Sequence, residues 1–172
     1  MSHFKRRAPS PTVTGNYRRY LPFVREDFVY QCAYCLLSEV LASGVENFEL
    51  DHFKPKKRFP NLLNDYYNLY YACHPCNHGK RDFWPPAELE RQGLSIVDLC
   101  KEEFASHFIQ EDDGHLRGLS ASASYTIDIL RLNRKHLVTA RKLLQKFGLR
   151  IDDRDLTSTL THLLALGDSS SA

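Results

Sequence analysis

The stretch that decides the fold lies between residues 32 and 80. It contains CAYC at 32–35, FELDHFKPKKRFP at 48–60 and DYYNLYYACHPCNHGK at 65–80. Two Cys-x-x-Cys pairs therefore enclose a segment that carries an Asp-His step, at Asp51 and His52. Four thiolates in two such turns can surround one zinc ion tetrahedrally, which makes a closed structural site. The residues that carry chemistry are then expected between the two turns and just after them.

The predicted zinc ligands are Cys32, Cys35, Cys73 and Cys76. No signal-peptide pattern opens the chain and no apolar run is long enough to span a membrane, so we expect a cytoplasmic protein with reduced thiols. In that compartment paired Cys-x-x-Cys motifs favour metal binding, with disulfides as the alternative. Cys100 lies apart from both motifs, and we expect it to be a buried free thiol.

The order Cys-x-x-Cys, Asp-His, Asn, Cys-x-x-Cys-Asn-x-x-Lys resembles the HNH endonuclease family. Fifteen residues lie between His52 and Asn68, and eight lie between Asn68 and Asn77, which is similar to the family's spacing. The segments FELDHFKPK, YYNLYYACHPCN and TIDILRLNR also resemble a bacterial HNH subgroup of phage-defence gene sets. Retron-like and Septu-like systems are among these sets, and the HNH protein accompanies an ATPase in them.

The resemblance implies an α+β fold built on a ββα-metal (His-Me finger) HNH nuclease core with a four-cysteine zinc site. We place this core at residues 31–84, after a basic N-terminal arm and short helix at 1–30. Residues 85–172 are expected to form a mainly helical extension with one β-hairpin, in the same domain or packed on it.

Local patterns predict the individual elements. Strands are expected at 48–53 and 66–72, followed by a helix that begins near Asn77. Residues 1–16 are expected to be an arm or poorly ordered. Further helices are predicted at 22–30, 95–108, 125–132, 135–147 and 152–166, and a hairpin at 107–119 around Asp113-Gly114.

The basic residues are unevenly distributed, although the net charge is only +2. Residues 1–25 contain six Lys and Arg side chains and no acid. Two more basic groups flank the predicted metal site, and a single run of this kind would indicate no more than solvated surface. Because these two groups adjoin the site, we expect them to contact a phosphate backbone. The predicted contacts are Lys54, Lys56, Lys57, Lys80 and Arg81.

The polar residues match the needs of phosphodiester hydrolysis, which requires a base for water and a cation for the phosphate. A neutral imidazole at His52 can act as the base. The resemblance implies that Asp51 binds the catalytic ion, although a regular strand would point it away from His52. At Asn77, an amide oxygen suits Mg²⁺ or Mn²⁺, but Asn77 could also cap the helix. His78 is an alternative ligand if the helix begins one residue later.

Asn68 corresponds to the middle residue of the motif, which implies that it braces the loop and keeps His52 aimed. We therefore predict a metal-dependent endonuclease that cleaves DNA with His52, Asn68 and Asn77 in its site and acts in anti-phage defence. RNA is a second substrate, since backbone contacts carry little information about the sugar. Two other hypotheses stay open: a non-catalytic zinc-ribbon module that binds nucleic acid or protein, and a defence subunit that is silent without its ATPase.

Overall fold

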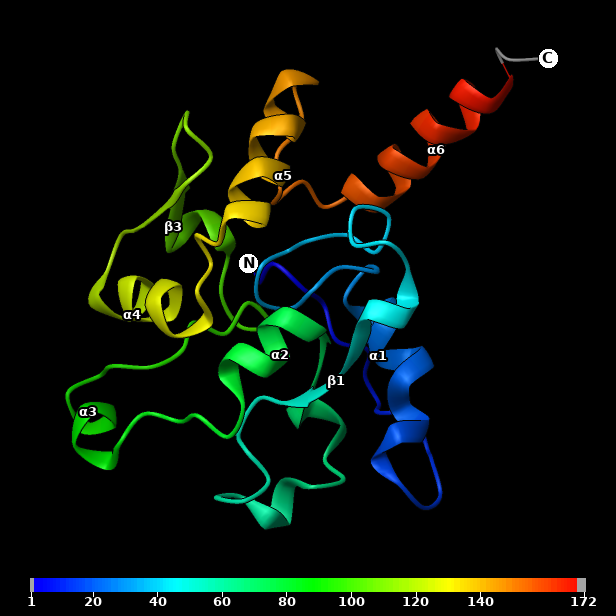
Figure 1. Cartoon of the computed structure of the whole chain (residues 1–172). Coiled ribbons are helices and arrows are strands. Elements are labelled where there is room, and N and C mark those ends of the chain that lie inside the picture. Colours follow the sequence, from blue (N-terminus) through cyan, green and yellow to red (C-terminus); the bar gives the residue numbers. More distant parts are fainter. Residues whose placement is uncertain (1, 170–172) are drawn as a thin grey trace.

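The protein combines short strands with helices around one core (Figure 1), and the computed structural model describes residues 2–169. The strands are β1 (Phe48–His52), β2 (Leu69–Cys73), β3 (Phe108–Gln110) and β4 (Leu116–Gly118). The helices are α1 (Leu21–Asp27), α2 (His74–Lys80), α3 (Ala87–Arg91), α4 (Ala121–Leu130), α5 (Lys135–Lys146) and α6 (Leu156–Ser169).

An antiparallel strand pair followed directly by a helix forms the centre of the molecule. β1 and β2 pair with Leu50 opposite Tyr71 and Asp51 opposite Tyr70. All five residues of β2 are buried, because α1 also packs against this strand. α2 follows β2 without a loop and contacts both strands, so that residues of β1 and α2 can meet on one side of the pair (Figure 1).

α2 begins at His74, three residues earlier than predicted. Pro75 lies in its first turn, where the fixed φ of proline suits a helix and the missing N–H costs nothing. The second Cys-x-x-Cys motif therefore forms the start of the helix itself. Asn77 lies inside the helix, which excludes its alternative role as the cap, and the condition under which His78 would replace it as ligand is not met.

The N-terminal arm packs on the core, and the prediction that it is poorly ordered is wrong for residues 2–8. The Phe4 side chain is 1% exposed and its ring lies 4.7 Å from that of Phe28. The Phe4 N–H donates to the carbonyl of Leu99 at 3.0 Å. Arg6 lies over the Tyr66 ring and donates to Asp27 at 3.2 Å. Part of the N-terminal positive charge is therefore neutralised inside the protein.

Residues 95–103 are not helical, so the predicted helix at 95–108 is wrong; only a 3₁₀ turn at Phe104–Ser106 falls within it. The polar groups of this segment find partners in other elements instead. The Val97 N–H donates to the hydroxyl of Thr126 at 2.9 Å, and the Tyr70 hydroxyl donates to Asp98 at 2.6 Å. Its apolar side chains are buried by tertiary contacts, which override the helical spacing.

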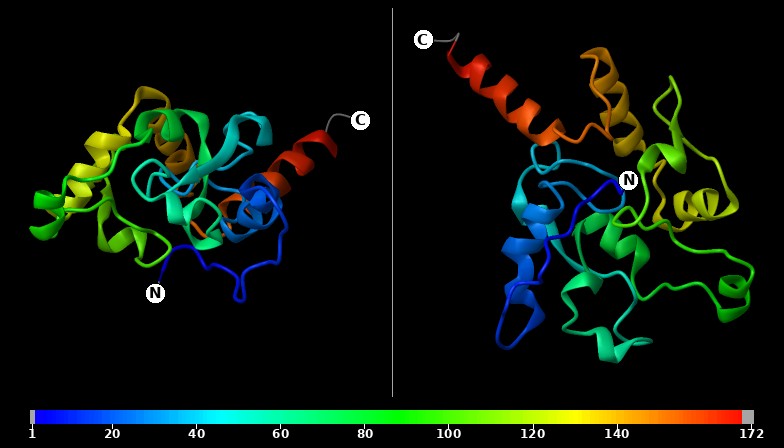
Figure 2. Two further views of the ribbon diagram at one scale, coloured as in Figure 1. Left: turned by 90° about the horizontal axis from the view of Figure 1, so that it is seen from below. Right: turned by 180° about the vertical axis from the view of Figure 1, so that it is seen from behind.

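The C-terminal part carries the remaining elements. β3 and β4 pair antiparallel within the segments expected to form a hairpin. Arg141 of α5 is fully buried and donates to the carbonyls of Gly114 and Leu132, which ties the hairpin to α5. α6 projects from the body of the molecule (Figure 2). No helix formed by residues 2–169 is long and apolar enough to cross a membrane.

Candidate active site

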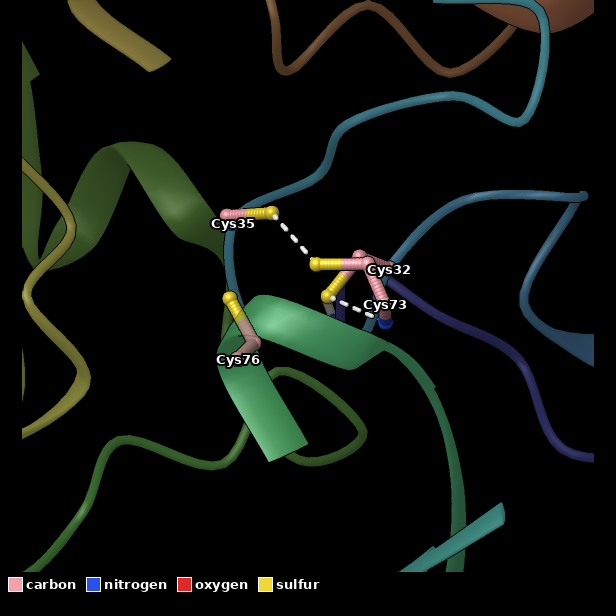
Figure 3. A group of neighbouring side chains, drawn as sticks. All are labelled: Cys32, Cys35, Cys73 and Cys76. Carbon is pink, nitrogen blue, oxygen red and sulfur yellow. Dashed lines mark hydrogen bonds between the residues drawn. The ribbon is translucent and has the colours of Figure 1, made fainter. Parts of the chain in front are cut away.

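The four predicted zinc ligands come together as free thiols, and this part of the prediction is confirmed. The sulfur atoms of Cys32, Cys35, Cys73 and Cys76 lie within 4.8 Å of one another and turn toward a common centre (Figure 3). Cys35 Sγ and Cys73 Sγ are 3.8 Å apart. Four sulfurs at about 2.3 Å from one zinc ion would have edges of about 3.8 Å. The cluster thus fits a tetrahedral metal ion, and its full burial suits a structural site.

Two N–H groups donate to the cysteine sulfurs. The Cys73 N–H donates to Cys32 Sγ at 3.4 Å, and Arg134 Nη2 donates to Cys76 Sγ at the same distance. Arg134 Nη1 also donates to the carbonyl of Pro75 at 2.7 Å. A guanidinium beside a thiolate offsets the negative charge that four cysteines bring to an ion. Sequence reasoning did not assign this role to Arg134, although it lies in the TIDILRLNR segment.

A cavity of about 380 Å³ brings together three of the predicted site residues, whereas Asn68 lines another cavity. Asp51 and His52 of β1 line it together with Asn77 of α2. The two neighbouring residues of β1 thus line one cavity, although a regular strand would turn them to opposite faces. The Asn77 side chain makes no hydrogen bond to any other described residue, so its oxygen is free to bind a ligand.

The His52 ring is fixed by two contacts. Its Nε2 lies 2.9 Å from the carbonyl oxygen of Leu63, and the edge of the Tyr17 ring packs against it at 4.7 Å between centroids. A carbonyl oxygen can only accept, so Nε2 carries the proton and Nδ1 of the neutral ring is the acceptor. Nδ1 has no hydrogen-bond partner within residues 2–169. The ring therefore holds the tautomer that a general base requires.

Asn68 ties together both ends of the loop that follows β1. Its Oδ1 accepts from the Lys54 N–H at 2.8 Å, and its Nδ2 donates to the carbonyl of Lys54 at 3.0 Å. A longer contact of 3.4 Å joins Nδ2 to the carbonyl of Leu62. Leu63, the next residue, accepts from His52. The amide of Asn68 thus supports the carbonyl that orients the imidazole.

Asp51 is held by a buried cluster behind the cavity. Its Oδ2 accepts from the Tyr34 hydroxyl and forms an ion pair with Lys80 Nζ at 2.8 Å. Lys80 Nζ also donates to the His52 carbonyl at 2.7 Å, which fixes both neighbouring residues. Burial raises the pKa of Asp51 above its usual range, against the pull of Lys80 and Tyr34. Oδ1 has no partner in the described chain, so it is the atom that fits a cation.

The predicted nucleic-acid contacts separate into different environments. Lys80 is buried and paired, so its prediction as a surface contact is wrong. Lys56 and Arg81 are exposed and line the cavity. Lys57 forms an exposed ion pair of 2.5 Å with Asp82. Lys54 lies over the Phe59 ring and lines another cavity.

Tyr17 and Arg18 are among the cavity residues that the sequence did not predict. Both belong to a 3₁₀ turn at Tyr17–Tyr20, which Asn16 caps by accepting from the Arg18 N–H. Arg18 is exposed and makes no ion pair among the described residues. The only signal in the sequence was the basic pair Arg18-Arg19, which was grouped with the rest of the arm.

One known family matches the part of the chain that holds the cysteine cluster and the central residues of the cavity. The family model for HNH endonuclease matches residues 32–83, which include the four clustered cysteines as well as Asp51, His52, Asn68 and Asn77. This stretch of the chain is therefore similar to the HNH endonuclease family. No curated protein matches the chain.

Proposed function

We propose that this protein is a metal-dependent endonuclease of the ββα-metal type that hydrolyses phosphodiester bonds of DNA. One observation carries the proposal. His52, with its tautomer set by the carbonyl of Leu63, lines the same cavity as Asp51 and Asn77, two residues with an unpaired ligand oxygen. The match of the HNH family model to this region supports it.

In the proposed reaction, His52 Nδ1 takes a proton from a water molecule in the cavity. The water oxygen bonds to phosphorus while the bond to the departing sugar oxygen breaks, and that oxygen is protonated from solvent. Tyr17 and Leu63 keep the imidazole in place during the transfer, since they contact two different parts of the ring.

Asp51 Oδ1 and the amide oxygen of Asn77 would hold one Mg²⁺ or Mn²⁺ ion. When bound, such an ion neutralises charge on the phosphate and on the leaving oxygen. Two protein oxygens leave several positions for water and substrate, as is usual for magnesium. Lys80 and Tyr34 keep Asp51 in place from behind and use only Oδ2.

Three exposed cations are the proposed contacts to the phosphate backbone of the substrate. Arg18, Lys56 and Arg81 line the cavity and make no ion pair within the described chain. Cations around an open cavity attract a phosphate backbone with little preference for base sequence. For the same reason RNA is a second candidate substrate.

Supercoiled plasmid incubated with the zinc-loaded protein and Mg²⁺ or Mn²⁺ tests the proposal. We expect nicking or cutting by the wild type and a loss of about 10²- to 10⁴-fold with His52→Ala. His162→Ala, at an exposed position on α6, is the matched control. Equal cleavage by wild type and His52→Ala would remove His52 from the reaction.

A second candidate function is a zinc-ribbon module that binds nucleic acid without cleaving it. The pairing of Asp51 with Lys80 favours this reading, because the carboxylate is neutralised without any ion. Calorimetry of the zinc-saturated protein separates the two functions. Magnesium or manganese binding that Asn77→Ala abolishes supports the nuclease, and no such binding supports the module.

The resemblance to HNH proteins of retron-like and Septu-like gene sets supports a role in cytoplasmic anti-phage defence with an ATPase partner. The cysteine cluster also contacts the extension at 85–172, because Arg134 donates to Cys76 Sγ. This contact supports the view that the extension and the core fold as one unit. Co-purification of the tagged protein with an ATPase from its native cells would test the partnership. Full protection against phage when that ATPase is deleted would contradict it.

A further inference from the structure

Glu49, on β1, has a carboxylate oxygen with no hydrogen-bond partner among residues 2–169. Its Oε1 is shielded from solvent although the side chain as a whole is 38% exposed. Two imidazole nitrogens lie near it: His74 Nε2 at 3.9 Å and His78 Nδ1 at 4.0 Å. Both distances exceed that of a hydrogen bond. A shielded carboxylate oxygen without a partner is unfavourable, so a cation at this point would stabilise the arrangement.

The two histidines are presented side by side by α2. They are four residues apart on this helix, which places them on one face, and their ring centroids are 6.1 Å apart. His78 Nδ1 lies 2.9 Å from the carbonyl oxygen of His74, so Nδ1 carries the proton and Nε2 is the acceptor. The His78 side chain is 76% exposed and can therefore turn its Nε2 toward Glu49.

We propose that Glu49, His74 and His78 form a second metal site that selects a divalent transition ion such as Zn²⁺, Ni²⁺ or Co²⁺. Two imidazoles and one carboxylate suit these ions, whereas magnesium prefers oxygen ligands alone. Ligand atoms about 2.1 Å from one ion lie about 3.4 Å apart in a tetrahedron. The site therefore closes by about half an ångström at the 3.9 Å contact between His74 and Glu49.

This site is separate from the cysteine cluster and adjoins the proposed nuclease cavity. Glu49 and His78 also line that cavity, while Asp51 and Asn77 do not contact the two histidines through any hydrogen bond or ion pair in the described chain. An ion at Glu49 would add positive charge at the rim of the cavity. This ion would bind at Glu49 whether or not the protein cleaves nucleic acid.

Calorimetry with Ni²⁺ on tag-free, zinc-saturated protein tests the site. We expect one Ni²⁺ ion to bind while the zinc content stays constant, and excess Mg²⁺ not to displace it. His74→Ala and His78→Ala should each weaken this binding at least about tenfold, in line with the loss of one ligand. His162→Ala, another exposed histidine, should leave it unchanged.

Two further variants separate this site from the nuclease cavity. Glu49→Gln should weaken Ni²⁺ binding, while Asn77→Ala should leave it intact. Ni²⁺ binding that Asn77→Ala abolishes but His74→Ala leaves unchanged would overturn the proposal, because the ion would then lie in the nuclease cavity. No binding by the wild type would also overturn it. Failure of plasmid cleavage with normal Ni²⁺ binding would count against the proposed nuclease alone.

Discussion

At two neighbouring sites, the cysteine cluster and the cavity, α2 holds polar residues in opposite ways. At its start, Cys73 and Cys76 meet Cys32 and Cys35 in a fully buried cluster whose four sulfurs leave no position open. The residue after Cys76, Asn77, lines a cavity of about 380 Å³, and its amide has no hydrogen-bond partner within residues 2–169. The cysteine cluster is closed, as a structural metal site requires, whereas the cavity is open, as a site that must admit substrate requires.

The same comparison applies to the charges around the helix. Lys80 is buried behind the cavity and fixes Asp51, while the next residue, Arg81, is exposed on the rim. These two neighbouring cations thus have different roles: Lys80 positions Asp51, and Arg81 faces the solvent. The cysteine cluster and the buried Lys80 stabilise the fold. The cavity and the exposed Arg81 remain available to a ligand.

Disrupting the cysteine cluster should have the largest effect on the stability of the protein. Structural zinc contributes apparent binding free energies of about 10–16 kcal/mol in small domains, which is comparable to the whole stability of a domain. We expect Cys73→Ser, or removal of the ion by a chelator, to unfold residues 31–84, as measured by circular dichroism and thermal melting. Cys100→Ser, outside the cluster, is the control and should melt close to the wild type.

Removing the buried charge should have the next largest effect. Lys80→Met leaves Asp51 buried without its cation, and breaking such a pair costs about 3–5 kcal/mol. Urea unfolding of zinc-loaded protein measures this loss. Arg81→Ala is the matched control: its stability should change by less than about 0.5 kcal/mol, while nucleic-acid binding should weaken and depend less steeply on salt. Equal stability losses for the two variants would contradict the distinction.

The smallest of these effects should come from the guanidinium beside the cluster. Arg134→Ala removes a donor to Cys76 Sγ without removing a ligand. Loss of such an outer partner lowers metal affinity by about 10- to 100-fold. Competition for zinc with a coloured chelator measures this change. Arg131→Ala, three residues earlier and exposed, should retain the wild-type affinity.

Short-range sequence patterns predicted the cysteine cluster well. The four cysteines cluster because the Cys-x-x-Cys spacing already brings each pair together. The Ala33 N–H then donates to the carbonyl of Tyr71 on β2 at 2.7 Å, which joins the first pair to the second. The strands themselves fall within a residue or two of the predicted ranges, apart from the 3₁₀ turn Tyr66–Asn68 that precedes β2.

What failed depended on contacts between distant segments. Lys80 and Arg81 are equivalent in the sequence, and only the packing of α2 on β1 buries one of them. The apolar spacing at 95–108 resembled a helix, but partners on β2 and α4 hold the segment in another conformation. Tyr17 reaches His52 across more than thirty residues of chain, which no local pattern can indicate.

The central claim is that a divalent ion and the His52 imidazole meet in the open cavity. Anomalous diffraction from crystals of the zinc-loaded protein soaked in Mn²⁺ tests this most directly. We predict a zinc peak inside the four cysteine sulfurs and a manganese peak bound by Asp51 Oδ1 and Asn77 Oδ1 beside His52. A cavity without manganese at saturating concentration, with the zinc peak present, would contradict the account.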